Sequence, residues 1–309
     1  MKELRDKVVA EISKTVVGQS EAAEMLVLAA CIGGHVLVEG VPGVAKTLIA
    51  RAFARAVALD FGRVQFTPDM LPSDLTGTMT LRHQDLVFRP GPVFAEVLLA
   101  DEINRTPPKT QSALLEAMQE RQVTVDGVPH PLPDSFVVLA TQNPVEYEGT
   151  YPLPEAQLDR FLFKVEISYP SEADETTMVT MGREGLVPST LDRVQPVATR
   201  DDLLSARRQI DRTTVSDEVA HYVVAIVRST RDLPSVELGA SPRAAVHLTV
   251  AAKAAARAAG RDFITPDDVV SVAPAVLRHR VVLRPEAELE RFSPDQAIAT
   301  AVQAVAVPR

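Results

Sequence analysis

Residues 40–47, with the sequence GVPGVAKT, have the residue types and spacing of a loop that binds a nucleoside triphosphate. The loop follows an apolar run at residues 35–39 and opens a segment whose apolar residues recur at helical spacing, which is the order that such a loop requires. Backbone N–H groups at this kind of helix start face the phosphates, the Lys46 ammonium reaches the β and γ phosphates, and the Thr47 hydroxyl coordinates magnesium. The alternative is an ordinary strand-to-helix turn.

One position departs from the usual pattern, because Ala45 stands where glycine normally precedes the lysine. Its methyl group requires a backbone conformation that an L-residue can adopt at modest cost. The residues expected to contact the nucleotide are Gly40, Pro42, Gly43, Val44, Ala45, Lys46, Thr47 and Leu48.

Two adjacent acids, Asp101 and Glu102, follow a second apolar run that begins at Val97. They would lie at the carboxyl edge of a sheet, where α/β proteins bind ligands. Asp101 would hold magnesium, directly or through water, and Glu102 would polarise the attacking water. Alternatively, both acids cap the next helix, whose start is indicated by the Thr-Pro-Pro sequence at residues 106–108.

A neutral amide, Asn143, stands just beyond a third apolar run at residues 136–141. From there it could orient the attacking water or contact the γ phosphate. Taken alone, the Asn-Pro pair at residues 143–144 indicates only a turn.

Two arginines are candidates for contact with a phosphate. Arg160 precedes the last apolar run, so it could reach a neighbouring subunit's nucleotide, unless it forms a local salt bridge with Asp159 or Glu155. Arg243 lies in the first turn of a predicted helix, where the macrodipole disfavours a cation unless an anion such as a γ phosphate is near. Alternatively, its side chain extends into solvent.

The elements that position these residues alternate between short apolar runs and helical patterns, as in a three-layer αβα domain with a parallel sheet. The five predicted strands are residues 35–39, 63–67, 97–101, 136–141 and 161–167. Residues 77–91 and 123–133 have turn residues and weak alternation, so they are predicted to form hairpins inserted into this core.

After about residue 169 the strand signal disappears and helix starts recur at Thr199, Ser241 and Thr265. We therefore expect a core domain at residues 1–168 and an all-helical second domain at residues 169–309.

Composition narrows the classes of function. The chain has 41 acidic residues against 32 Lys plus Arg and a net charge of -9, which does not indicate a nucleic-acid surface. Its one cysteine, Cys31, excludes a disulfide framework or thiolate metal site within the chain and is expected to be buried. Without a secretory signal at residues 1–14 or an apolar stretch long enough to span a bilayer, we expect a cytoplasmic protein with no membrane insertion.

Taken together, GVPGVAKT, VLLADEINR, ATQNP, YPLPEAQLDRF and SPR resemble the AAA+ ATPases, specifically the MoxR family in the branch related to magnesium chelatases. The resemblance covers nearly the whole chain. It implies an αβα P-loop core with strand order 5-1-4-3-2, followed by a helical lid. It also implies that the loop at residues 40–47 is Walker A, and that Asp101 and Glu102 form Walker B.

Further roles are implied by the same resemblance. Asn143 is similar to sensor 1, Arg160 to the arginine finger and Arg243 to sensor 2. Residues 15–19, with the sequence TVVGQ, resemble the segment beside the adenine, although a plain connection between two helices is the alternative. The adenine-binding residues would be Val17, Gly18 and Gln19. Residues 77–91 resemble the helix-2 insert, and residues 123–133 the pre-sensor-1 hairpin.

The function implied is hydrolysis of ATP, with Mg2+, by a homo-oligomeric ring, expected to be a hexamer. The ring would remodel, mature or assemble a protein client, including metal-cofactor insertion, together with a von Willebrand factor A domain partner. The hairpins offer only Phe88 and the nearby Phe94 as aromatics, which favours local remodelling over threading. Two alternatives are a nucleic-acid motor or loader and an ATP-dependent scaffold that does not hydrolyse ATP.

Overall fold

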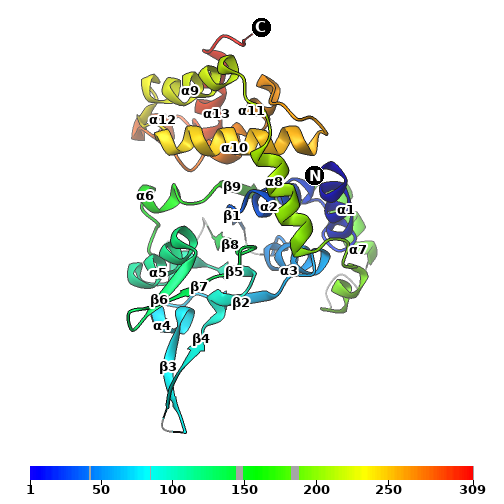
Figure 1. Cartoon of the computed structure of the whole chain (residues 1–309). Helices are drawn as coiled ribbons and strands as arrows, with labels where there is room; N and C mark the ends of the chain where they lie inside the picture. The colour runs from blue at the N-terminus through cyan, green and yellow to red at the C-terminus, as the bar shows by residue number, and fades with distance from the viewer. Residues whose placement is uncertain (42, 84, 144–148, 182–187, 309) are drawn as a thin grey trace.

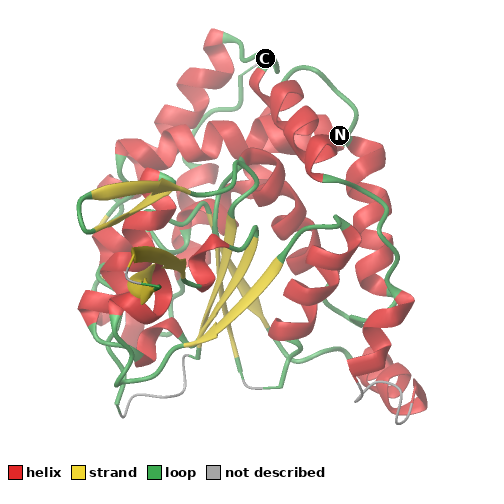
Figure 2. Ribbon diagram, turned by 60° about the horizontal axis from the view of Figure 1, so that its bottom comes forward, coloured by secondary structure: helices red, strands yellow, loops and turns green. Residues whose placement is uncertain are grey.

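A computed structural model describes residues 1–41, 43–83, 85–143, 149–181 and 188–308 of the chain. Its centre is a five-stranded parallel sheet with helices on both faces (Figures 1 and 2). The strands are β1 Val36–Gly40, β2 Phe61–Gln65, β5 Val97–Asp101, β8 Val137–Gln142 and β9 Phe163–Ile167. The sheet order β2-β5-β8-β1-β9, numbered along the chain, is 5-1-4-3-2 read from the β9 side, which confirms the expected fold.

The strand ends depend on pairing that the sequence pattern does not contain. β5 has the predicted bounds, whereas β2 begins two residues before the predicted start at residue 63. Phe61 pairs with Val97, the first residue of β5, and the ladder ends where Gln65 pairs with Asp101. The neighbouring strand therefore sets both ends of β2.

Alternate residues of the strands pack on opposite faces of the sheet. Val36 and Val38 belong to a core with α2 and α3, whereas Leu37 belongs to a second core with α5. The helices of this part are α1 Lys2–Ser13, α2 Ser20–Ile32, α3 Lys46–Ala56, α4 Pro72–Thr76, α5 Pro108–Glu120 and α6 Glu155–Leu158, with 3-10 turns η1 Pro92–Phe94 and η2 Ile103–Arg105. Cys31 is buried in α2 as expected, and burial raises the pKa of its thiol to about 12.

Both predicted insertions are antiparallel hairpins. They consist of β3 Gly77–Arg82 with β4 Asp85–Pro90, and of β6 Gln122–Val125 with β7 Val128–Pro131. The first extends from the end of the molecule opposite the C-terminal helices (Figure 1). Phe88 stacks on His130 of the second hairpin, with ring centroids 3.9 Å apart, and packs edge-on against Phe94. These aromatics therefore join the hairpins to each other and to the core.

The C-terminal part is helical, with one short exception. Its helices are α7 Glu172–Met181, α8 Arg200–Asp211, α9 Asp217–Asp232, α10 Pro242–Ala258, α11 Pro266–Leu277, α12 Pro285–Leu289 and α13 Pro294–Gln303, with a 3-10 segment η4 Pro188–Arg193. Two short strands, β10 Val236–Leu238 and β11 Val282–Leu283, pair antiparallel, so the expectation of helices alone is wrong at this point. They are too short to show periodicity in the sequence.

The predicted helix starts are confirmed: Thr199, Ser241 and Thr265 are the N-caps of α8, α10 and α11. Contacts do not divide the chain cleanly at residue 168, because α2 packs against both α8 and α10. The division into domains at that residue stays a prediction. Among the described residues, no helix has the length and apolar character needed to cross a membrane.

Thr199 caps α8 in a reciprocal arrangement with Asp202. The Asp202 N–H donates to the threonine hydroxyl at 3.4 Å, and the Thr199 N–H donates to the Asp202 carboxylate at 2.9 Å. We expect Thr199→Ala to lower the free energy of unfolding by about 1 kcal/mol, because one helix N–H loses its partner. Urea unfolding followed by circular dichroism measures this, and Thr199→Ser, which keeps the hydroxyl, should be nearly neutral. Equal losses in both variants would instead implicate the threonine methyl group.

Candidate nucleotide-binding site

The loop between β1 and α3 has glycines at two positions where the backbone needs them. At Gly40, a Cβ atom would lie 2.6 Å from the carbonyl oxygen of Ile167, so only glycine lets β1 pair closely with β9 here. Gly43 has φ 85°, and among the described residues other than its chain neighbours nothing lies within 4 Å of its Cβ position. The loop backbone therefore faces open space, as a phosphate cradle requires. Pro42, predicted to contact the nucleotide, lies outside the described residues.

Ala45 adopts the left-handed conformation, with φ 63° and ψ 20°, directly before the first residue of α3. A non-glycine residue in this region costs about 1–2 kcal/mol. The strain lies at the point where the chain changes from loop to helix. A cost of this size is in line with the modest one predicted for the methyl group at this position.

The loop and both predicted acids surround one cavity of about 380 Å³. Its lining consists of Gly43, Ala45, Lys46, Thr47, Leu48, Asp101, Glu102 and Asn143. The Lys46 ammonium donates to the Gly40 carbonyl oxygen at 2.5 Å, so it lies across the mouth of the loop. Buried Asn143 follows the end of β8. The structure thus brings together residues from three predicted motifs: the loop, the adjacent acids and Asn143.

Asp101 is held by two side chains that the sequence analysis did not single out. The Thr141 hydroxyl donates to Asp101 Oδ1 at 2.6 Å, and Arg63 Nη2 donates to Asp101 Oδ2 at 2.8 Å. Thr141 comes from β8 and Arg63 from β2, the two strands on either side of β5. Both are terminal residues of predicted strands: Arg63 is the first of residues 63–67, and Thr141 is the last of residues 136–141.

Glu102 has a left-handed backbone, with φ 58°, and its carboxylate is engaged on one oxygen. Gln65 Nε2 donates to Glu102 Oε2 at 2.6 Å, and Arg105 Nε lies 3.0 Å from the same oxygen. The alternative that the acids cap the next helix is wrong. That helix, α5, begins at Pro108 with Pro107 as its N-cap, and the 3-10 turn η2 separates it from the acids.

The predicted adenine segment borders a second cavity, of about 190 Å³, beside the loop. Val17 and Gln19 line it together with Val44, Ala45 and four residues that the sequence analysis missed, namely Tyr169, Pro170, Glu175 and Met178. Gly18 has φ 76°, and a Cβ atom there would lie 2.9 Å from a carboxylate oxygen of Asp174. The segment after β9 thus packs against residues 17–19. The sequence pattern of neither segment predicts this contact, because the two are far apart in the chain.

Arg160 and Arg243 lie away from this site. They line another cavity, of about 520 Å³, together with Gly34, His35 and Leu162, which precede β1 and β9. This is the amino edge of the sheet, whereas the loop follows the carboxyl end of β1. Five residues of β1 at about 3.3 Å each separate the two edges by roughly 16 Å. None of the described loop residues lines this cavity.

The arginine cavity is lined by three arginines, Arg121, Arg160 and Arg243, and by one acid, Asp211, among the described residues. Burial lowers the pKa of His35 to about 3 and that of His247 to about 4, so both rings are neutral near pH 7. Arg160 does not form the predicted alternative salt bridge, because Asp159 pairs with Arg280 instead and, among the described residues, Arg160 has no acidic partner. Arg160 is therefore available to an anion.

The oxygen donors of the loop cavity fit magnesium. Thr47 and Asp101 offer a hydroxyl and a carboxylate, and Mg2+ in nucleotide sites uses one or two such groups together with phosphate oxygens. In the described part of the chain no group of three or more His, Cys, Asp or Glu side chains could hold a metal by itself. A magnesium ion here would therefore need the nucleotide as a ligand.

We expect Ala45→Gly to raise the free energy of unfolding by about 0.5–1 kcal/mol, because relief of the left-handed strain exceeds the entropy cost of glycine. The measurement is urea unfolding without nucleotide. The matched change Ala54→Gly, in the middle of α3, should lower stability by about 1 kcal/mol, because its backbone is helical. A lower stability of Ala45→Gly than of wild type would show that the left-handed backbone at Ala45 is not strained.

Comparison with known proteins gives a consistent assignment. Residues 35–163 match the model of the ATPase family associated with various cellular activities (AAA), and residues 228–306 match an AAA lid domain. The chain is 44% identical to the chaperone MoxR1 of Mycobacterium tuberculosis over 98% of this chain and 82% of that protein. It is 46% identical to the uncharacterised YeaC of Bacillus subtilis over 99% of this chain and 95% of that protein.

A solved structure agrees with these sequence matches. A candidate ATPase from Cytophaga hutchinsonii superposes with a TM-score of 0.90 at 43% identity, covering 99% of this chain and 96% of that one. Both the fold and the order of its parts are therefore shared over the full length of the described structure. The chain belongs to the MoxR family of AAA ATPases, whose membership implies nucleotide binding.

Proposed function

We propose that this protein hydrolyses ATP to ADP and phosphate in sites that two copies of the chain build together. The observation that supports this proposal most strongly is that the predicted catalytic residues lie in two separate cavities. The loop, Asp101, Glu102 and Asn143 surround one cavity, while Arg160 and Arg243 line another at the opposite edge of the sheet. Head-to-tail contact between copies would bring the two sets together, as in a closed ring, and we expect a hexamer.

Within one copy, each residue has a chemical task. Lys46 and the loop N–H groups neutralise charge on the β and γ phosphates. Glu102 polarises the attacking water, which requires its carboxylate to leave Gln65 and Arg105 at least in part. Asn143 orients that water or the γ phosphate. Magnesium, held by Thr47 and Asp101, supplies further charge neutralisation when bound.

The other copy contributes the arginines. A guanidinium directed at the γ phosphate stabilises the charge that develops as the bond to the leaving ADP breaks. Arg243 is also favoured there because a phosphate offsets the repulsion between its charge and the α10 dipole. Hydrolysis would then depend on assembly.

Use of this energy on a protein client is supported by similarity to a protein named a chaperone. The two hairpins, joined through Phe88 and His130, form the projection that would contact the client. Exposed Leu81 and Leu86, paired across the first hairpin, supply apolar surface for this contact. Maturation of client proteins, insertion of metal cofactors and a von Willebrand factor A domain partner belong to the same proposal.

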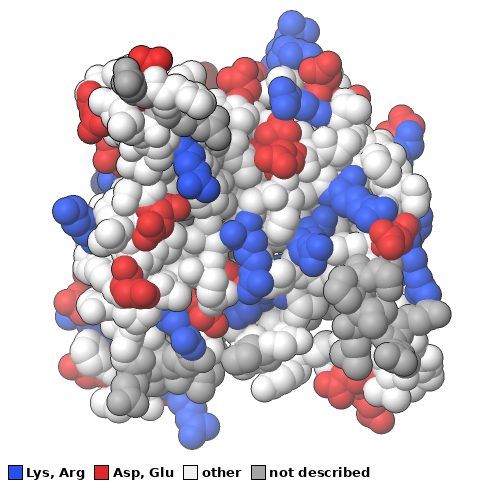
Figure 3. Space-filling view, turned by 90° about the horizontal axis from the view of Figure 1, so that it is seen from below, with Lys and Arg blue, Asp and Glu red and all other residues white. Residues whose placement is uncertain are grey.

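The alternative of a nucleic-acid motor has less support. Lys and Arg side chains are interspersed with Asp and Glu on the face shown in Figure 3, without a continuous basic surface across it. The overall charge of -9 points the same way. A scaffold that only binds ATP would not need Glu102 and Asn143 beside the loop.

Glu102→Gln should reduce ATP turnover by about 100-fold or more while the protein keeps its affinity for a fluorescent ATP analogue, because the amide cannot polarise water but preserves shape. Phosphate release and equilibrium titration measure the two quantities. Glu116→Gln, an exposed change on α5, is the matched control and should leave both unchanged. Full turnover in Glu102→Gln would assign the general base elsewhere.

An equimolar mixture of Arg160→Ala and Lys46→Ala proteins should recover part of the turnover that each lacks alone. The first keeps an intact loop and the second keeps intact arginines, so one interface in a mixed assembly is complete. A mixture of Lys46→Ala with Glu102→Gln should stay inactive, because neither copy has a working loop cavity. Wild-type turnover per chain should also rise with protein concentration. If the mixture of Arg160→Ala and Lys46→Ala recovers no ATP turnover, the proposal of a shared site is wrong.

A further inference from the structure

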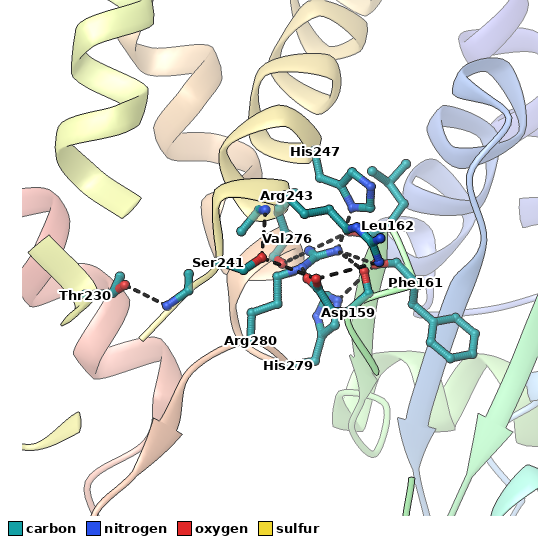
Figure 4. A network of polar contacts seen from close by, with 12 residues as sticks. Asp159, Phe161, Leu162, Thr230, Ser241, Arg243, His247, Val276, His279 and Arg280 are labelled. Atoms are coloured by element: carbon teal, nitrogen blue, oxygen red, sulfur yellow. Dashed lines mark hydrogen bonds and ion pairs between the residues drawn. The ribbon is translucent and has the colours of Figure 1, made fainter. Parts of the chain in front are cut away.

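A cluster of polar side chains joins the lid to the residues just before β9 (Figure 4). Its centre is Asp159, whose carboxylate contacts residues from two separate lid segments. Arg280 Nε donates to Asp159 Oδ1 at 2.6 Å, and the Ser241 hydroxyl donates to Asp159 Oδ2 at 3.2 Å. One carboxylate thus connects the core to the start of α10 and to the segment after α11.

Arg280 is the buried half of this joint, with 1% of its side chain exposed. Besides Asp159, it donates to the backbone oxygens of Phe161 at 2.5 Å, Leu162 at 3.3 Å and Val276. These contacts fasten residues 159–162 to the C-terminal end of α11. Burial lowers the pKa of Arg280 to about 10, against the opposing effect of Asp159, so the guanidinium remains charged at neutral pH.

A buried cation of this kind depends on its counter-ion. Removing one partner of a buried pair leaves the other charge uncompensated, which is far more costly than losing a surface pair. Among the described residues, Asp159 is the one carboxylate paired with Arg280. The geometry of the joint is therefore set by Asp159.

Arg160 and Arg243, two of the three arginines that line the neighbouring cavity, are attached to this joint. Arg160 is the next residue after Asp159 in the chain, and Arg243 Nη1 lies 3.9 Å from Asp159 Oδ2. Ser241 is the N-cap of α10, so its bond to Asp159 fixes the first turn, where Arg243 stands. One turn later, His247 accepts a hydrogen bond from Arg280 at 2.6 Å, which requires its neutral form.

Arg243 itself is 48% exposed, and its contact with Asp159 is longer than a hydrogen bond. The carboxylate therefore orients the Arg243 guanidinium but leaves its N–H groups able to donate to another acceptor. Asp159 lies close enough to offset the unfavourable α10 dipole, and a phosphate could displace this loose contact.

We propose that Asp159 is a positioning residue that presents Arg160 and Arg243 as a fixed pair to the nucleotide of the neighbouring subunit. This inference rests on the proposed shared site. In this proposal Asp159 has no role at the chain's own loop cavity. Loss of the Asp159 charge should therefore impair the arginines at the amino edge of the sheet (the arginine edge) and leave the loop cavity at the carboxyl edge intact.

The test is Asp159→Asn in the full-length assembled protein. We expect kcat to fall by about 10- to 100-fold, because misplacement of a catalytic group by about 1 Å has an effect of this size. Affinity for a fluorescent ATP analogue should stay within about 2-fold of wild type, because Asp159 lies at the edge of the sheet opposite the loop cavity. A 2-fold change is far below the 10-fold that about 1.4 kcal/mol represents.

Mixtures identify which edge is damaged. Asp159→Asn should recover turnover with Lys46→Ala, whose arginine edge is intact, and should not recover with Arg160→Ala, whose arginine edge is also defective. Recovery with Arg160→Ala, or wild-type turnover of Asp159→Asn alone, would overturn the inference. So would the absence of recovery with Lys46→Ala, because a general structural defect has that result.

Two further variants keep the test decisive. Asp295→Asn neutralises another Asp–Arg pair of the lid, with Arg278, and should leave kcat unchanged. If Asp159→Asn does not fold, the double variant Asp159→Asn with Arg280→Gln removes both charges of the joint and should give the same pattern of mixtures.

If Arg160→Ala and Lys46→Ala fail to recover each other, the shared site is wrong, and the role of Asp159 fails with it. If they recover and Asp159→Asn also recovers with Arg160→Ala, the role of Asp159 alone is wrong.

Discussion

All five core strands run in the same direction, and this constraint gives the two edges of the sheet different chemistry. At the carboxyl edge, the strand ends are followed by the nucleotide loop, two acids and Asn143. At the amino edge, the starts of β1 and β9 border the arginine cavity. Parallel strands need a crossover between each pair, and these crossovers are the helices that cover both faces. The whole arrangement of functional groups follows from strand direction.

Side chains at the carboxyl edge support one another across strands. Asp101 on β5 is oriented by Thr141 on β8 and Arg63 on β2, so its position depends on the register of both neighbours. The Thr141 hydroxyl also accepts from the Glu102 N–H at 2.9 Å, where the backbone takes its left-handed turn. A shift of one residue in either strand would direct these side chains to the opposite face.

The sequence predicts the fold and most of the loop cavity because these depend on local signals. Strand, glycine-rich loop and helix follow one another within residues 35–57, and the acids and Asn143 each end an apolar run. Arg63, Gln65, Thr141 and Tyr169 were missed because their roles arise only from contacts between segments far apart in the chain. The same reason explains the shifted bounds of β2 and the unpredicted β10–β11 pair. The contacts of Arg280 likewise come from packing of the lid against β9, which no periodicity encodes.

In the proposed assembly, the separation of the two edges would also determine how many working sites are present. A head-to-tail contact would use one edge from each copy, so each contact would make one complete site. An open row of n copies then has n − 1 complete sites and one terminal loop without arginines, whereas a closed ring has n. Ring closure would therefore change the number of active sites as well as the shape, and the loss of one subunit would silence a site on a neighbour that is itself intact.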